Sequence, residues 1–247
     1  MSAPRLFSSI QLRANTEIVL GNEQARYVGR VLRLRPGDDL TAFDGSGGEY
    51  AVTVRTVTKR QLKLAIGKHH CRSTESPLKI RLVQGVSRGE KMDTVVQKAT
   101  ELGVHRISPV LSEFSVVRLD ADRAAKRRDH WQKIAQSACE QCNRNIVPVV
   151  DAPQSLVDWF EDHAGSADLQ LILRPDAVDC MPAVAMAGRE LTILVGPEGG
   201  FSKAEHERAM AAGLQAVRLG PRIMRTETAA LAALSIAQAT WGDCRAP

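Results

Sequence analysis

The sequence has few cysteines and lacks any long hydrophobic run. Its 247 residues include five cysteines at irregular spacings, too few for the disulfide framework of a secreted protein. Nowhere do about 18 apolar residues follow one another, as a membrane-spanning helix requires. The segment Met1–Thr16 also lacks the apolar core of a signal peptide. These absences argue against export and membrane insertion, and a reducing cytoplasm is the expected location.

Signatures of metal and nucleotide binding are also missing. A zinc site could be assembled from His69, His70 and Cys71 with the C-x-x-C pair Cys139 and Cys142, but one such pair without a second is a weak signal, so we expect no metal. The sequence contains neither G-x-G-x-x-G nor G-x-x-x-x-G-K-[ST]. Sites for NAD and ATP are therefore disfavoured.

Positive charge is concentrated in the first third of the chain. Residues 1–75 contain 12 Lys and Arg against 7 Asp and Glu, whereas residues 76–247 contain 21 of each, so the net charge of +5 lies entirely in the first part. A local basic excess is typical of proteins that bind a polyanion, because each neutralised phosphate releases counterions. An ordinary solvated surface is the alternative that charge alone leaves open.

The pattern of residues 1–72 predicts a small β-domain, a barrel or a sandwich. Short apolar alternation predicts strands at Leu40–Phe43, Tyr50–Val57 and Leu62–Ile66, and the glycine-rich segment 44–48 predicts a hairpin loop between the first two. One helix interrupts the strands, with Asn22 as its N-cap. Its buried stripe consists of Ala25, Val28 and Leu32, so the basic residues Arg26, Arg30 and Arg33 are expected on its exposed face.

The polar segment that ends at Pro77 marks a domain boundary, and the pattern after it changes to α/β. Short apolar strands alternate with helical stretches, which is typical of a mainly parallel sheet with helices on both faces. The expected strands are 80–83, 107–110, 170–173, 191–195 and 216–219. Two helices are clearly indicated, at 93–102 and at about 120–142.

Two glycine-containing loops follow successive strands of this second domain. The strand Leu191–Val195 leads into Gly196–Gly200, after which Ser202 and Glu205 form a capping box that opens a helix. The second loop begins at Leu219, and Thr226 or Thr228 is expected to cap the helix that follows it. Either loop alone could be a plain turn. Two such loops at the carboxyl ends of parallel strands predict a ligand site.

These loops carry a resemblance to a known family. The segments 195–202 (VGPEGGFS) and 219–229 (LGPRIMRTETA) resemble the signatures of the RsmE family of SPOUT methyltransferases. The resemblance extends to 31–38, 97–103, 140–144 and Pro148, in the family's order. The family methylates N3 of a uridine in 16S ribosomal RNA with S-adenosylmethionine (SAM).

The resemblance implies a fold, a cofactor and partners. A PUA-like RNA-binding domain is implied for residues 1–72, and a methyltransferase domain for 73–247, with a trefoil knot over about 195–240. The implied partners are 16S ribosomal RNA in the small subunit and a second copy of the chain in a homodimer, with no membrane and no metal. The residues implied to bind SAM are Leu173, Val195, Gly196, Pro197, Glu198, Gly199, Gly200, Leu219, Gly220, Ile223, Met224, Arg225, Thr226, Glu227, Thr228 and Ala229.

The chemistry of N3 methylation suggests roles for further residues. The base must lose its imide proton, so Arg225 is expected to stabilise the uracil anion. Glu140, Gln141 and Arg144, at the end of the long helix, are expected to position the base or to assist proton removal. The expected phosphate contacts are Arg5, Arg26, Arg30 and Arg33.

Two departures from the family pattern bear on the target, and two other functions stay open. Tyr27 stands where the family commonly has histidine, and Phe114 lies in a stretch that usually includes an arginine, so RNA contacts could differ while the cofactor loops are intact. One alternative is a SPOUT methyltransferase that acts on another RNA position. The other is a non-catalytic protein that binds RNA or assists ribosome assembly.

Overall fold

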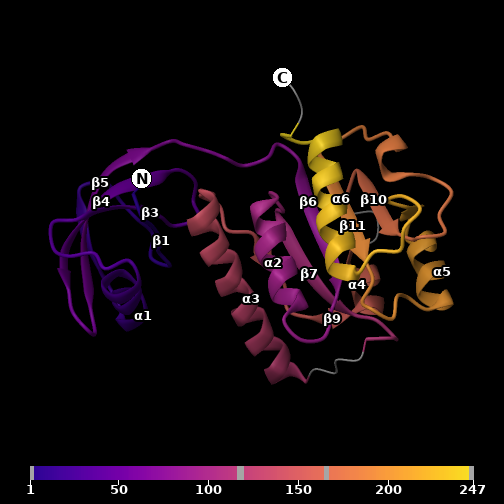
Figure 1. Ribbon diagram of the computed structural model, residues 1–247, viewed down its shortest axis with the longest axis horizontal. Helices are drawn as coiled ribbons and strands as arrows, with labels where there is room; N and C mark the ends of the chain where they lie inside the picture. The colour runs from indigo at the N-terminus through magenta and orange to yellow at the C-terminus, as the bar shows by residue number, and fades with distance from the viewer. Residues whose placement is uncertain (1–2, 116–119, 164–166, 245–247) are drawn as a thin grey trace. The chain divides into compact units, whose positions relative to one another are not determined.

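A computed structural model describes residues 3–115, 120–163 and 167–244, which form two compact units (Figure 1). The first unit consists of Met1–Glu75 together with Cys139–Val147, and the second of Ser76–Ala138 together with Pro148–Pro247. The first unit therefore differs from the expected domain 1–72 in taking up a second segment, 139–147, from far along the chain.

The first unit is built on one five-stranded sheet. Its strands are β1 (Arg5–Phe7), β2 (Thr16–Leu20), β3 (Asp39–Phe43), β4 (Glu49–Val57) and β5 (Leu62–His70). They are arranged in the order β1-β3-β4-β5-β2, in which only the β1–β3 pair is parallel. Alternate residues of β4 and β5, such as Val52, Val54, Leu62 and Leu64, point into the core. The three strands expected from alternation are confirmed, whereas β1 and β2 were missed.

The helix of the first unit is shorter and less regular than its pattern predicts. The helix α1 (Asn22–Arg26) continues directly as a π-helical turn, Tyr27–Val31. Its N-cap is Gly21, without a side-chain hydrogen bond, so the expected cap at Asn22 was wrong by one residue. Ala25 and Val28 are buried, as the stripe predicts.

The second unit contains one sheet in which every pairing is parallel. Its strands are β6 (Lys79–Gly85), β7 (Arg106–Leu111), β8 (Val149–Val150), β10 (Leu169–Leu173), β11 (Glu190–Val195) and β12 (Gln215–Val217), with β9 (Gln154–Ser155) paired to β7. The order is β12-β10-β11-β6-β7-β8. The five expected strands are confirmed, although β12 ends at Val217, two residues earlier than expected.

Helices cover both faces of this sheet. Val83, Leu194 and Ile172 lie in register on neighbouring strands and pack against α4 (Leu156–His163) and α5 (Lys203–Ala211). On the other face, α2 (Lys91–Glu101) and α6 (Thr226–Thr240) lie against each other in front of the strands (Figure 1). The remaining helices are α3 (Ala121–Cys142) and the short 3-10 turn Met181–Ala183.

Among the helices in the described part of the chain, none has the length and apolar character needed to cross a lipid bilayer. The helix α4 was missed because its eight residues offer only two turns of pattern. The α/β class expected for the second part of the chain is confirmed.

Candidate active site

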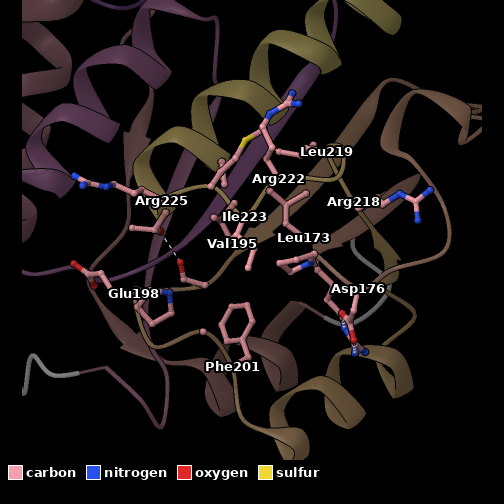
Figure 2. Close-up of a pocket in the computed structure, with 18 of the residues that line it drawn as sticks. Leu173, Asp176, Val195, Glu198, Phe201, Arg218, Leu219, Arg222, Ile223 and Arg225 are labelled. Atoms are coloured by element: carbon pink, nitrogen blue, oxygen red, sulfur yellow. Dashed lines mark hydrogen bonds and ion pairs between the residues drawn. The ribbon is translucent and has the colours of Figure 1, made fainter.

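A pocket lies at the carboxyl ends of three neighbouring strands in the second unit. Because β12, β10 and β11 are adjacent and parallel, the segments that follow them converge at one edge of the sheet. They enclose a pocket of about 580 Å³, within the range of small-molecule sites. Figure 2 shows Leu173 and Val195 near the middle of the pocket, Leu219 above them beside Arg222, and Phe201 below them.

The loop after β11 is a tight turn held against β6. The backbone N–H of Gly200 donates to the carbonyl of Pro197 at 2.9 Å, and Gly200 has a φ of +70°, which favours glycine. Gly85, at the end of β6, is in close contact with the loop, since a Cβ there would lie 2.4 Å from Pro197. The capping box of Ser202 and Glu205 is present as predicted and begins α5.

The loop after β12 is attached to the first loop through Thr226. The Thr226 hydroxyl donates to the carbonyl oxygen of Gly196 at 2.5 Å and accepts from Nε2 of the buried Gln84 at 2.9 Å. The N-cap of α6 is Arg225, whose side chain makes no capping hydrogen bond. The prediction that Thr226 or Thr228 caps this helix was therefore wrong, because the Thr226 hydroxyl bonds across to the neighbouring loop instead.

Two ion pairs set the charge at the sides of the pocket. Lys91 Nζ lies 2.8 Å from Glu198 Oε1, and Arg174 lies 2.6 Å from Asp176. Burial raises the pKa of Glu198, but the hydrogen bond and charge of Lys91 outweigh it and hold this pKa below the ordinary value. The hydrogen bond from Arg174 likewise lowers the pKa of Asp176. Both carboxylates are therefore ionised at neutral pH.

His206 borders the pocket as a neutral side chain. Its ring packs edge-to-face on Phe201, with 5.8 Å between the ring centroids. Burial, followed by the charge of Arg174, lowers the pKa of His206, which keeps the imidazole uncharged at neutral pH. A neutral, partly apolar wall here suits an uncharged ring system of a ligand.

Comparison with protein families gives two matches that together cover most of the chain. Residues 74–238 match the model described as RNA methyltransferase domain, and residues 20–67 match the RNA methyltransferase PUA domain. The chain belongs to the RNA methyltransferase family.

Individual members of the family are similar over nearly the full length. This RNA methyltransferase is 35% identical to the ribosomal RNA small subunit methyltransferase E of Buchnera aphidicola, over 97% of this chain and 94% of that protein. The identity to the Bacillus subtilis protein of the same name is 34%, over 86% of each. A crystal structure of the Neisseria gonorrhoeae enzyme bound to S-adenosyl methionine superimposes with a TM-score of 0.93, at 38% identity, over 98% of this chain and 100% of that one.

The structure brings most of the residues predicted for the cofactor into this one pocket. Of those residues, only Gly199, Glu227 and Thr228 do not line it. Sequence reasoning missed several lining residues, namely Lys91, Arg174, Pro175, Asp176, Phe201, His206, Val217, Arg218 and Arg222. Most of them immediately follow or precede a predicted strand end, so the strand pattern could have indicated them.

The predicted catalytic residues divide between the two units. Arg225 lines the pocket, while Glu140, Gln141 and Arg144 belong to the first unit. Glu140 accepts a hydrogen bond from the Phe7 N–H at 2.8 Å and a second from Tyr27, and burial raises its pKa against these bonds. Gln141 is exposed.

Two of the predicted functional arginines are buried in ion pairs. The Arg144 side chain is 6% exposed and lies 2.5 Å from Glu75, and the Arg5 side chain is 6% exposed and lies 2.5 Å from Glu49. Arg5 also donates to Asn145 Oδ1 at 2.6 Å. Its expected role as a phosphate contact does not fit this position, because its charge is paired with Glu49 and its side chain is buried. Arg26, Arg30 and Arg33, in contrast, are exposed.

The residues weighed for zinc are not assembled into a site. Cys71 is exposed on the chain after β5 and Cys139 is buried in α3. Over the described ranges, no group of three or more His, Cys, Asp or Glu side chains is arranged to hold a metal ion.

Proposed function

We propose that this RNA methyltransferase transfers a methyl group from SAM to N3 of a uridine in the 16S RNA of the small ribosomal subunit. The observation that carries the proposal is the pocket in which the loops after β10, β11 and β12 meet, lined by nearly all the residues that the family resemblance implies for SAM. Its support comes from the similar Neisseria gonorrhoeae enzyme, which was crystallised with this cofactor.

The residues of the pocket fit SAM. Leu173, Val195, Leu219 and Met224 provide apolar contacts for a purine ring, and the adjoining glycines leave main-chain N–H and C=O groups accessible. Glu198 is ionised at the pocket wall and suits a ligand that carries positive charge. When bound, SAM supplies a methyl group activated by attachment to a positively charged sulfur.

Within this proposal, the protein positions the base and stabilises its anion. The new bond joins uracil N3 to the methyl carbon while the methyl–sulfur bond breaks and its electron pair stays on sulfur. The N3 proton must leave to solvent or to a neighbouring base. Arg225 lines the pocket, and among the described residues it forms no ion pair, so its charge is available to the uracil anion. Alignment of N3 with the methyl group supplies the remaining acceleration.

Glu140, Gln141 and Arg144 are proposed to act together at the end of α3. Glu140 and Arg144 anchor that helix end through Phe7 and Glu75, respectively, and Gln141 offers an exposed amide for contact with the base. Arg26, Arg30 and Arg33 are proposed to contact RNA phosphates, since all three are exposed and lie in or next to the basic helix of the first unit.

We also propose a trefoil knot over about residues 195–240, a homodimer and a cytoplasmic location. The knot rests on the family resemblance, and the hydrogen bond from Thr226, the first residue of α6, to Gly196 is consistent with it, because it holds the chain after β12 against the loop that follows β11. The homodimer rests on the family resemblance. The location follows from the proposed substrate, since ribosome assembly takes place in the bacterial cytoplasm.

The test combines calorimetry with methyl transfer. Purified protein is titrated with SAM, with NADH and ATP as control ligands, and then incubated with labelled SAM and undermethylated small subunits. Binding of SAM alone, with label at a uridine N3, is expected. Label at another position would favour a different RNA target, and absence of SAM binding would favour a non-catalytic RNA-binding protein.

A further inference from the structure

The pocket carries more positive charge than a methyl donor requires. Its lining includes five cationic side chains, Lys91, Arg174, Arg218, Arg222 and Arg225, against two carboxylates, Asp176 and Glu198. Lys91 and Arg174 are the ones that form ion pairs with these carboxylates. In the part of the chain that the structure describes, the other three arginines form no ion pair. They therefore leave an uncompensated positive charge around the pocket.

This excess is local. The segment 76–247, which contains the whole pocket, has 21 basic and 21 acidic residues and is neutral overall. Three unpaired arginines within eight residues of one loop thus stand out from a balanced surface. SAM itself carries a positive sulfonium, a positive ammonium and one carboxylate, so it is a net cation. A net cation gains nothing from three further cations at its site, and the excess indicates an additional, anionic ligand.

The directions of the side chains indicate the form of that ligand. Figure 2 shows the labelled Arg218, Arg222 and Arg225 on different sides of the pocket, with their side chains directed outward from its centre. Arg222 is exposed, and Arg218 uses one guanidinium nitrogen to donate to the Ala177 carbonyl at 2.9 Å, leaving its other donors available. One small anion could not bridge cations that point apart. A chain of phosphates along the rim could.

We propose that Arg218 and Arg222 bind backbone phosphates of the RNA on either side of the target nucleotide, so that the strand runs across the mouth of the pocket. This inference rests on the proposed function and adds to it a substrate-binding surface on the second unit. The guanidinium group suits the role, since it keeps its charge at any physiological pH and presents several donors to phosphate oxygens. Phosphate contacts of this kind fix the position of the strand, whereas contacts with the base itself decide which base is selected.

The variants Arg218→Gln and Arg222→Gln, alone and combined, test the proposal. RNA binding is measured by fluorescence anisotropy with a labelled fragment of small-subunit RNA over a series of salt concentrations, and SAM binding is measured by calorimetry. Each lost phosphate contact is expected to reduce the slope of log affinity against log salt by about 0.7, the value for single-stranded nucleic acid. The SAM dissociation constant is expected to stay the same.

The control is Arg189→Gln, which removes an exposed arginine just before the amino end of β11, while the pocket lies at the carboxyl end. Its salt slope should equal that of the wild type. If the wild-type protein methylates RNA but the Arg218 and Arg222 variants both keep the wild-type salt slope, the proposal is overturned and the proposed function stands. A weaker SAM affinity with an unchanged slope would overturn it by assigning these arginines to the cofactor carboxylate. A wild-type protein that binds neither SAM nor RNA would refute the proposed function as well.

Discussion

The side chain of Thr226 joins the two loops of the pocket, because its hydroxyl donates to the carbonyl oxygen of Gly196 at 2.5 Å. The two residues lie 30 positions apart in the chain. Gln84, from a third strand, completes the arrangement by donating to the same hydroxyl at 2.9 Å. Thr226 and Gln84 are buried and Gly196 is half-buried, so the loops share one hydrogen-bonded support, and the shape of the pocket depends on it.

Replacing Thr226 by valine should weaken both the fold and cofactor binding. Valine has nearly the same shape but no hydroxyl, so the half-buried Gly196 carbonyl and the buried Gln84 amide each lose a partner, at a total cost of about 1–3 kcal/mol. Urea denaturation and SAM calorimetry measure the two effects. Thr226→Ser keeps the hydroxyl and should retain the SAM affinity. Equal affinity in the valine variant would show that the bond does not shape the pocket.

Removal of the Arg225 guanidinium should greatly reduce turnover without preventing SAM binding. Loss of one group that stabilises a developing anion typically costs a factor of about 100–1,000 in rate. Methyl transfer to small subunits and SAM calorimetry are compared for Arg225→Ala. Arg208→Ala, an exposed arginine of α5 outside the pocket lining, is the matched control. Wild-type turnover in the Arg225 variant would refute the assigned role.

The half-buried carboxyl of Glu140 should make stability depend on pH. Burial raises its pKa in the folded protein above the unfolded value near 4.5, despite hydrogen bonds from Phe7 and Tyr27. The protonated Glu140 carboxyl therefore contributes a stabilisation of the folded protein. This contribution is fully present below the unfolded pKa and is lost as pH rises through the folded pKa. Urea denaturation of wild type and Glu140→Gln from pH 4 to 8 should show the wild type losing stability relative to the variant. If the difference in free energy of unfolding between the two proteins did not change with pH, this prediction would be contradicted.

Replacing Arg144 by alanine should destabilise the first unit. The Arg144 and Glu75 side chains are 6% and 18% exposed, and removal of one partner from a buried ion pair costs about 3–5 kcal/mol because the other charge stays buried. Thermal unfolding measures the loss, and the double variant Arg144→Ala with Glu75→Gln should recover part of it. If the Arg144→Ala variant kept the stability of the wild type but lost turnover, Arg144 would instead act by contacting the RNA base directly.

Loss of the basic helix charges should weaken RNA binding. Arg30→Glu is combined with Arg33→Asn, because Arg33 has a φ of +58° and asparagine tolerates that conformation. Affinity should fall for all RNA sequences alike, and the slope of log affinity against log salt should decrease by about 0.7 for each lost contact. Arg60→Glu, an exposed site in the same unit, is the control. If the combined Arg30 and Arg33 variant bound RNA with wild-type affinity, the helix would not be part of the RNA interface.

Much of the site was accessible from sequence because its residues follow strand ends. The pattern of β10 and β11 located the segments after Leu173 and Val195, and the order of a parallel sheet implied that such segments meet at one edge. The pairing of Lys91 with Glu198 was not accessible in this way. Lys91 begins α2, 107 residues before Glu198, and only the adjacency of β6 and β11 brings them to 2.8 Å.

The sequence by itself determined the helices and strands with clear periodicity, the class of each part of the chain, the capping box of Ser202 and the two loops. These are local properties, since they depend on the burial of residues at a fixed spacing and on turn and capping chemistry within a few residues. Tertiary structure decided the rest. It joined residues 139–147 to the first unit, buried Arg5 and Arg144 in ion pairs, and directed the Thr226 hydroxyl to Gly196 rather than to its own helix. Each of these outcomes depends on a partner far along the chain, and the order of the strands, not local pattern, determines which partners meet.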